Sequence, residues 1–210
     1  MAVNNNIYNH RVPFTTHSIY TVNFSGNSIL TFVTHTPSLV TDWITEINIS
    51  CHLRKTTVGF DIEWRPMLTS VEYYPVATLQ ICVGHRCLIF QILHSASIPE
   101  SLVEFLYNPS YTFVGVGIKR DIEKIEDDYG FGIGGEIVDL AQLAADRLGD
   151  EQLRSAGLKT LTNRVLGWEL VKPREITLSR WDNEVLDEFQ VQYACIDAFL
   201  SFEIGRVLNA

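Results

Sequence analysis

Segments with the composition of β-strands fill the first half of the chain, whereas apolar residues at helical spacing dominate its last third. Strands are expected at 18–24, 28–34, 57–63, 77–83, 87–92 and 111–116. Helices are expected at 38–50, 99–107, 119–129, 139–148, 155–166 and 184–208. A hairpin followed by strand–helix units disfavours a purely parallel sheet. The order therefore predicts an α/β domain of three layers, in which helices flank a mixed sheet.

The length of 210 residues suits one domain, expected over 17–210 and preceded by a polar N-terminal arm at 1–16. No apolar stretch is long enough to cross a membrane, and the first residues do not resemble a secretory signal. Four cysteines without metal-site spacing predict reduced thiols. These features favour an intracellular protein, nuclear or cytoplasmic, that is not secreted.

A net charge of −9 argues against a tight nucleic-acid binder. The objection weakens if carboxylates hold divalent cations, because bound cations would offer a positive face to phosphate. Acidity alone therefore does not exclude a nucleic-acid substrate.

Asp61 and Glu63 end an apolar strand that contains Val58, Gly59 and Phe60. Side chains alternate along a strand, so the two acids share one face, roughly 6–7 Å apart along the backbone. Two carboxylates on one face repel each other unless a cation lies between them, and oxygen ligands suit Mg²⁺ or Mn²⁺. The pattern Asp-x-Glu recurs at 121–123 and 182–184, where a solvated face or a helix start is the better explanation for Glu123, Asp182 and Glu184.

Two further elements carry candidate residues. Asp121 follows a glycine-rich strand end, where capping of a helix is the simple alternative to catalysis. Tyr193 and Asp197 are four residues apart and therefore share one face of the last helix. A buried aspartate among apolar neighbours needs a metal or a hydrogen-bond partner, although a satisfied Tyr–Asp pair would also fit.

The three elements, VGFDIEW at 58–64, GVGIKRD at 115–121 and YACIDA at 193–198, resemble the three motifs of the DEDD exonuclease superfamily. The resemblance is to the tyrosine variant, DnaQ-like, of the Werner-syndrome type, and it runs from about Thr57 to Leu208. It implies a ribonuclease-H-like fold, with a mixed sheet of about five or six strands.

The resemblance also implies a 3′→5′ exonuclease that releases nucleoside 5′-monophosphates by a two-metal-ion mechanism. Asp61, Glu63, Asp121 and Asp197 would hold two Mg²⁺ or Mn²⁺ ions, and Tyr193 would orient the attacking water. Contacts to the nucleic acid are expected from basic or aromatic side chains: Trp64, Arg65, Lys119 and Arg180, with Arg120, Arg164 and Trp181 as weaker candidates.

The expected partners are DNA or RNA 3′ ends, without a membrane and with a possible homo-oligomer. The sequence does not choose between DNA and RNA. The alternative is a catalytically silent protein of the same fold that acts as a nucleic-acid-binding or scaffold module. The complete set of five residues disfavours this alternative, because clustered acids are costly to a fold that binds no metal.

Overall fold

A computed structural model describes residues 5–11, 16–51, 55–67, 69 and 72–210. Within this part of the chain, one mixed sheet of eight strands runs in the order β1-β2-β3-β6-β5-β4-β7-β8. The strands are β1 Asn6–Asn9, β2 His17–Phe24, β3 Asn27–Thr34, β4 Thr56–Trp64, β5 Val76–Val83, β6 Arg86–Phe90, β7 Tyr111–Gly115 and β8 Glu136–Asp139.

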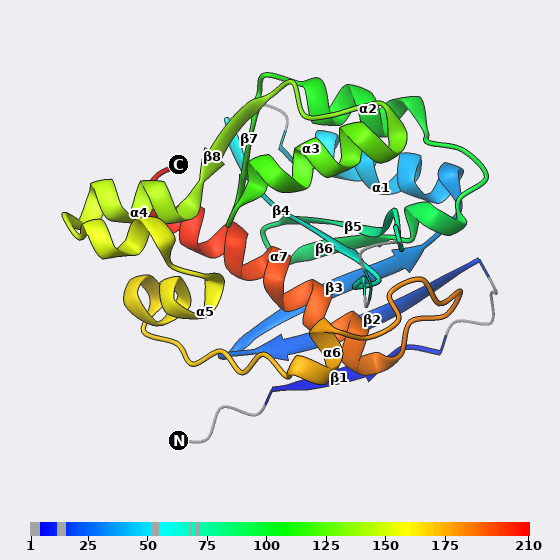
Figure 1. Ribbon diagram of the computed structural model, residues 1–210. Helices are drawn as coiled ribbons and strands as arrows, with labels where there is room; N and C mark the ends of the chain where they lie inside the picture. Colours follow the sequence, from blue (N-terminus) through cyan, green and yellow to red (C-terminus); the bar gives the residue numbers. More distant parts are fainter. Residues whose placement is uncertain (1–4, 12–15, 52–54, 68, 70–71) are drawn as a thin grey trace.

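Helices cover both faces of the sheet (Figure 1). One face carries α1 Pro37–Ser50, α2 Glu100–Tyr107 and α3 Ile118–Tyr129, and the other carries α7 Glu188–Leu208. On the α7 side also lie α4 Leu140–Leu148, α5 Leu158–Leu161 and α6 Arg174–Thr177. Short 3₁₀ turns are η1 Ile92–His94 and η2 Glu151–Ser155, and η3 Thr162–Leu166 is a π-helical turn. The three-layer α/β fold class is confirmed.

The sheet has more strands than expected because β1 and β8 add one short strand at each edge. Both strands are four residues long, which is too short for an alternating apolar–polar pattern to identify them in the sequence. β1 falls inside the segment expected to be an arm and pairs antiparallel with β2. Residues 1–4 and 12–15 of that arm lie outside the described residues.

The sheet contains both parallel and antiparallel strand pairs. β2 and β3 form the expected hairpin, in which Ser25 and Gly26 both have positive φ. This backbone is typical of the two-residue turn that matches the twist of the flanking strands. β3 pairs parallel with β6, and β4 lies between antiparallel β5 and parallel β7. β4 is therefore a central strand, covered by helices on both faces.

Helix α7 is buried over most of its length because its surface is apolar on nearly all sides. It begins at Glu188, four residues after the expected start at 184, because the Asp187 side chain caps it by accepting a hydrogen bond from the Gln190 amide at 2.9 Å. The expected helix at 155–166 is divided between α5 and η3.

Candidate active site

The close approach of α7 to β4 builds the site. Gly59 lies on the same face of β4 as Asp61, and a Cβ atom added at Gly59 would lie 2.0 Å from the Ala198 carbonyl oxygen. It would also lie 2.7 Å from the backbone nitrogen of Phe202. Only glycine allows this backbone contact, which sets Asp197 of α7 opposite the acids of β4.

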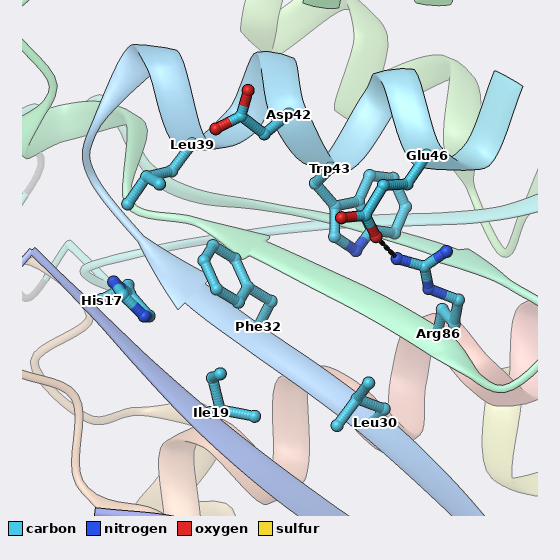
Figure 2. A pocket seen from close by; sticks show the side chains of 9 residues that line it. All are labelled: His17, Ile19, Leu30, Phe32, Leu39, Asp42, Trp43, Glu46 and Arg86. Carbon is cyan, nitrogen blue, oxygen red and sulfur yellow. Dashed lines mark hydrogen bonds and ion pairs between the residues drawn. The ribbon is translucent and has the colours of Figure 1, made fainter. Parts of the chain in front are cut away.

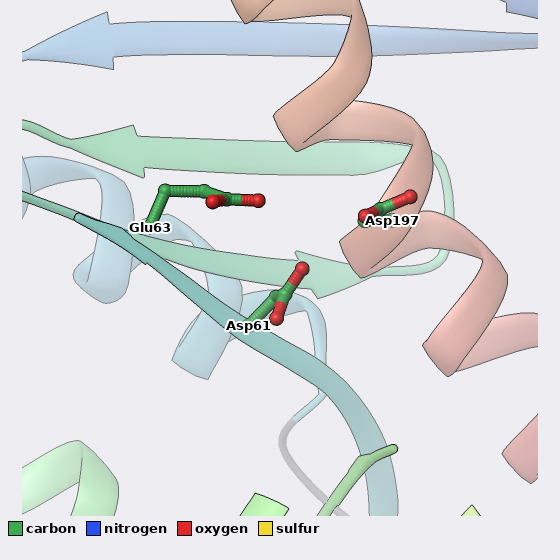
Figure 3. Close-up of side chains that lie close together, drawn as sticks. All are labelled: Asp61, Glu63 and Asp197. Carbon is green, nitrogen blue, oxygen red and sulfur yellow. The ribbon is translucent and has the colours of Figure 1, made fainter. Parts of the chain in front are cut away.

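Asp61, Glu63 and Asp197 point toward one another from β4 and α7 (Figure 3). Each offers a carboxylate oxygen, and the three oxygens lie within 4.8 Å of one another. The group could therefore hold a metal ion. Asp197 lies 134 positions after Glu63 in the sequence (197 − 63), and the fold brings it to the two acids of β4.

Burial raises the pKa of all three carboxyl groups. For Asp61 and Glu63 the shift is large, because neighbouring carboxylates add to the effect of burial: Asp197 and Asp121 act on Asp61, and Asp61 and Asp197 act on Glu63. For Asp197, burial raises the pKa although Lys172 opposes the change. Without a cation, the cluster therefore favours bound protons over three negative charges.

Asp121 lies in the first turn of α3, close to the three carboxylates of Asp61, Glu63 and Asp197 but not one of them. These three carboxylates are called the acid cluster. Its charge contributes to the raised pKa of Asp61. Burial, followed by the charge of Asp139, raises the pKa of Asp121 itself to about 7. Asp139 caps α4 and accepts a hydrogen bond from the Gly117 amide at 2.8 Å, which ties the β7–α3 turn to α4. Asp121 therefore belongs electrostatically to the acid cluster.

Tyr193 lies one turn before Asp197 on α7 and is buried. The Thr177 hydroxyl donates a hydrogen bond to the Tyr193 hydroxyl at 3.2 Å, and the Trp181 ring lies 5.8 Å from the tyrosine ring. Burial, followed by the charge of Asp197, raises the pKa of Tyr193 to about 12. The phenol is therefore protonated at neutral pH and able to donate a hydrogen bond.

Lys172 is a member of the site that the sequence did not reveal. Its ammonium donates a hydrogen bond to Asp197 Oδ2 at 2.5 Å and lies 4.8 Å from the centre of the Tyr193 ring. Burial alone would lower the pKa of Lys172, but the charges of Asp197 and Asp61 outweigh it and raise the pKa. The residue lies in an irregular segment without periodicity. The need of a shielded carboxylate cluster for a positive charge was the one available signal.

Two of the four candidate substrate contacts, Arg65 and Arg180, share one partner. Both guanidinium groups pair with Asp182 Oδ2 at 3.2 Å, and Arg65 also lies 4.6 Å from the centre of the Tyr74 ring. Arg180 is 63% exposed. These arginines therefore form a small ion-pair network with the third Asp-x-Glu copy, which is not part of the acid cluster.

The other candidates differ in exposure. Trp64 is partly buried beneath the Lys124 ammonium, 5.2 Å from its ring, and Lys119 is exposed on α3. Trp181, one of the weaker candidates for a nucleic-acid contact, is fully buried, so that expectation is wrong. Of the weaker basic candidates, Arg120 is exposed and Arg164 pairs with Asp150 at 2.8 Å.

A separate hollow of 330 Å³ lies on the opposite face of the sheet, between α1 and the β2–β3 hairpin (Figure 2). His17 stacks on Phe32 there with ring centres 4.9 Å apart, and Arg86 pairs with Glu46 at its rim. The sheet separates this hollow from the acid cluster. It therefore belongs to another part of the surface.

A mixed sheet that directs acids from a central strand toward the last helix defines a nuclease domain with the ribonuclease-H-like fold. The chain belongs to the 3′-5′ exonuclease family, whose family model matches residues 33–209. The expected family is thus confirmed.

Sequence similarity to known proteins supports this family. A 3′-5′ exonuclease of Arabidopsis thaliana is 39% identical over 154 residues, which cover 72% of this chain and 52% of that protein. The bifunctional 3′-5′ exonuclease/ATP-dependent helicase WRN of Mus musculus is 34% identical over 72% of this chain and 11% of its own length. The chain thus spans about half or less of these relatives.

Among solved structures, the fold is similar to that of Escherichia coli RNase D, an exoribonuclease involved in structured RNA processing. The TM-score is 0.67 at 20% identity, over 84% of this chain and 44% of RNase D. This similarity concerns the fold.

Among the described residues, no helix has the length and apolar character required to span a membrane.

Proposed function

We propose that this chain hydrolyses the terminal phosphodiester bond at the 3′ end of a nucleic acid and releases a nucleoside 5′-monophosphate. The observation that carries the proposal is the convergence of Asp61, Glu63 and Asp197 within 4.8 Å in a largely buried position. A fold gains nothing from three adjacent carboxylates, one buried and two partly buried, unless they bind a cation or take up protons. Membership of the 3′-5′ exonuclease family supports the same activity.

The donor set fits divalent cations that prefer oxygen, Mg²⁺ or Mn²⁺. Asp61, Glu63 and Asp197 would hold one ion, and Asp61 with Asp121 would hold a second. When bound, the ions would lower the pKa of the attacking water and stabilise the leaving 3′-oxygen. Gln80 of β5 is the residue paired with Asp61 of β4, and among the described residues its buried Oε1 has no hydrogen-bond partner. Buried acceptors without a protein partner usually bind an ordered water, so this atom supports the presence of a water molecule beside the acids.

The protein's own groups would prepare the attack. Tyr193, held as a protonated phenol, would orient the attacking water through its hydroxyl, and the Thr177 hydroxyl would fix the phenol in place. Asp197, one helical turn away, would hold the adjacent cation. This arrangement would position the water on the side of the cluster that α7 forms.

Contacts to the nucleic acid would come from the side chains around the cluster. Lys119, Arg65 and Arg180 would meet the phosphates, and Trp64 would stack on a base. The partners would be DNA or RNA 3′ ends, within an intracellular compartment. A homo-oligomer stays a prediction that light scattering checks.

The test is an assay with 5′-labelled oligonucleotides, DNA and RNA in parallel, with Mg²⁺, Mn²⁺ or a chelator. We expect a ladder of shortened products that disappears with the chelator and with Asp61→Ala. Glu123→Gln is the matched control, because Glu123 is the exposed acid of the second Asp-x-Glu copy. Absence of cleavage of either polymer in any metal would favour the silent binding module.

A further inference from the structure

Lys172 contacts the acid cluster at Asp197. Its side chain is 29% exposed, whereas that of Asp197, to which it donates a hydrogen bond at 2.5 Å, is 3% exposed. A surface ion pair of two solvated groups contributes little, but this aspartate has almost no access to water. The lysine therefore supplies much of the neutralisation that Asp197 receives in the metal-free protein.

We propose that Lys172 is the resident counter-ion of the metal-free site, and that its ammonium leaves Asp197 when a divalent cation binds. The inference rests on the proposed function, because it assumes that Asp197 is a metal ligand. A divalent cation and an ammonium group that both approach the Asp197 oxygen contacted by Lys172 would repel each other strongly at such short range. Lys172 and the divalent cation would therefore compete for one position.

The position of Lys172 in the chain suits such an exchange. Leu170 is buried and anchors the segment, and Pro173 caps α6 on the other side. Between these points a flexible four-carbon stem carries a compact, strongly hydrated charge. With its side chain partly exposed, the ammonium can move into water without a change in the backbone.

The exchange has a measurable consequence for metal affinity. A cation that must displace Lys172 loses part of its binding free energy to that displacement. Removing the ammonium should therefore strengthen metal binding, while it destabilises the metal-free protein by leaving Asp197 without its partner. A lysine that served only to hold the site in shape would have the opposite effect on metal affinity.

The experiment is calorimetric titration with Mn²⁺ in the absence of nucleic acid, together with thermal unfolding of the metal-free protein. Lys172→Met should bind Mn²⁺ about tenfold more tightly, which corresponds to ~1.4 kcal/mol, and should unfold at a lower temperature. Lys172→Arg keeps the charge and should stay near wild type. Lys159→Met is the matched control, because Lys159 is exposed on α5 and is not part of the acid cluster.

Equal or weaker Mn²⁺ binding by Lys172→Met would overturn the inference and leave the proposed function intact. A wild-type protein that binds no Mn²⁺ would overturn both. Crystal structures of the wild type, metal-free and soaked in Mn²⁺, give an independent test that needs no variant. We expect the contact between Lys172 Nζ and Asp197 Oδ2 only in the metal-free crystal, and its persistence beside a bound ion would refute the exchange.

Discussion

Asp61 is subject to more repulsion than a carboxylate in water would be, because burial and the charges of Asp197 and Asp121 all act on it. Its pKa in the folded chain therefore lies well above the value near 3.9 that it has when unfolded. As the pH rises from the unfolded value toward the folded one, the unfolded chain loses this proton while the folded chain keeps it, so the folded state loses stability. At neutral pH the metal-free protein is thus less stable than its packing allows.

Asp61→Asn removes this charge and keeps the shape of the side chain. We expect the variant to unfold ~2–4 °C above the metal-free wild type, a shift typical of about 1 kcal/mol in a chain of this size. Activity should fall by on the order of 10³-fold or more, since the acids act as a unit. Thermal unfolding in a chelator and the oligonucleotide assay measure the two effects. Glu123→Gln should change neither, and a lower unfolding temperature for Asp61→Asn would contradict the electrostatic argument.

Asp121 contributes to the pH dependence of the site, because burial and Asp139 raise its pKa to about 7. Below that pH the carboxyl group keeps its proton, and a metal ion must displace the proton in order to bind. Mn²⁺ affinity should therefore rise between roughly pH 6 and roughly pH 8, with protons released into the buffer. Titration calorimetry in two buffers of different ionisation enthalpy counts these protons. Affinity that is independent of pH would show that Asp121 and its neighbours bind the ion without losing protons.

At the scale of elements, the site depends on how closely β4 and α7 pack. Gly59→Ala would place a Cβ atom against the Ala198 carbonyl oxygen, so the helix or the strand must move. We expect a loss of stability of about 1–3 kcal/mol, and weaker Mn²⁺ binding because Asp61 and Asp197 separate. Gly157→Ala is the control, since a Cβ atom there meets open space and φ is negative. Wild-type Mn²⁺ affinity in a folded Gly59→Ala variant would contradict this geometry.

Strong periodicity made the longer elements predictable. The expected strands at 18–24 and 57–63 and the helix at 38–50 agree with β2, β4 and α1 to within one residue at each end. The four-residue elements β1, β8 and α6 were missed, since a segment so short displays no period. The pairing of β3 with β6 follows from tertiary packing, to which local sequence gives no clue. Sequence motifs identified the five candidate catalytic residues, whereas Lys172 lies outside all three motifs.

At the scale of the whole molecule, a net charge of −9 opposes the approach of a polyanion. If the acid cluster is where phosphate binds, divalent cations must reverse its charge first. A DNA oligonucleotide with a non-cleavable phosphorothioate at its last linkage should therefore bind at least about tenfold more tightly in Mg²⁺ than in a chelator. Fluorescence anisotropy measures the affinity at constant ionic strength. The gain should vanish in Asp197→Asn and persist in Glu123→Gln. Equal affinity in the chelator would mean that the oligonucleotide binds a surface other than the acid cluster, and the basic side chains around Arg65 and Lys119 would then be the first to test.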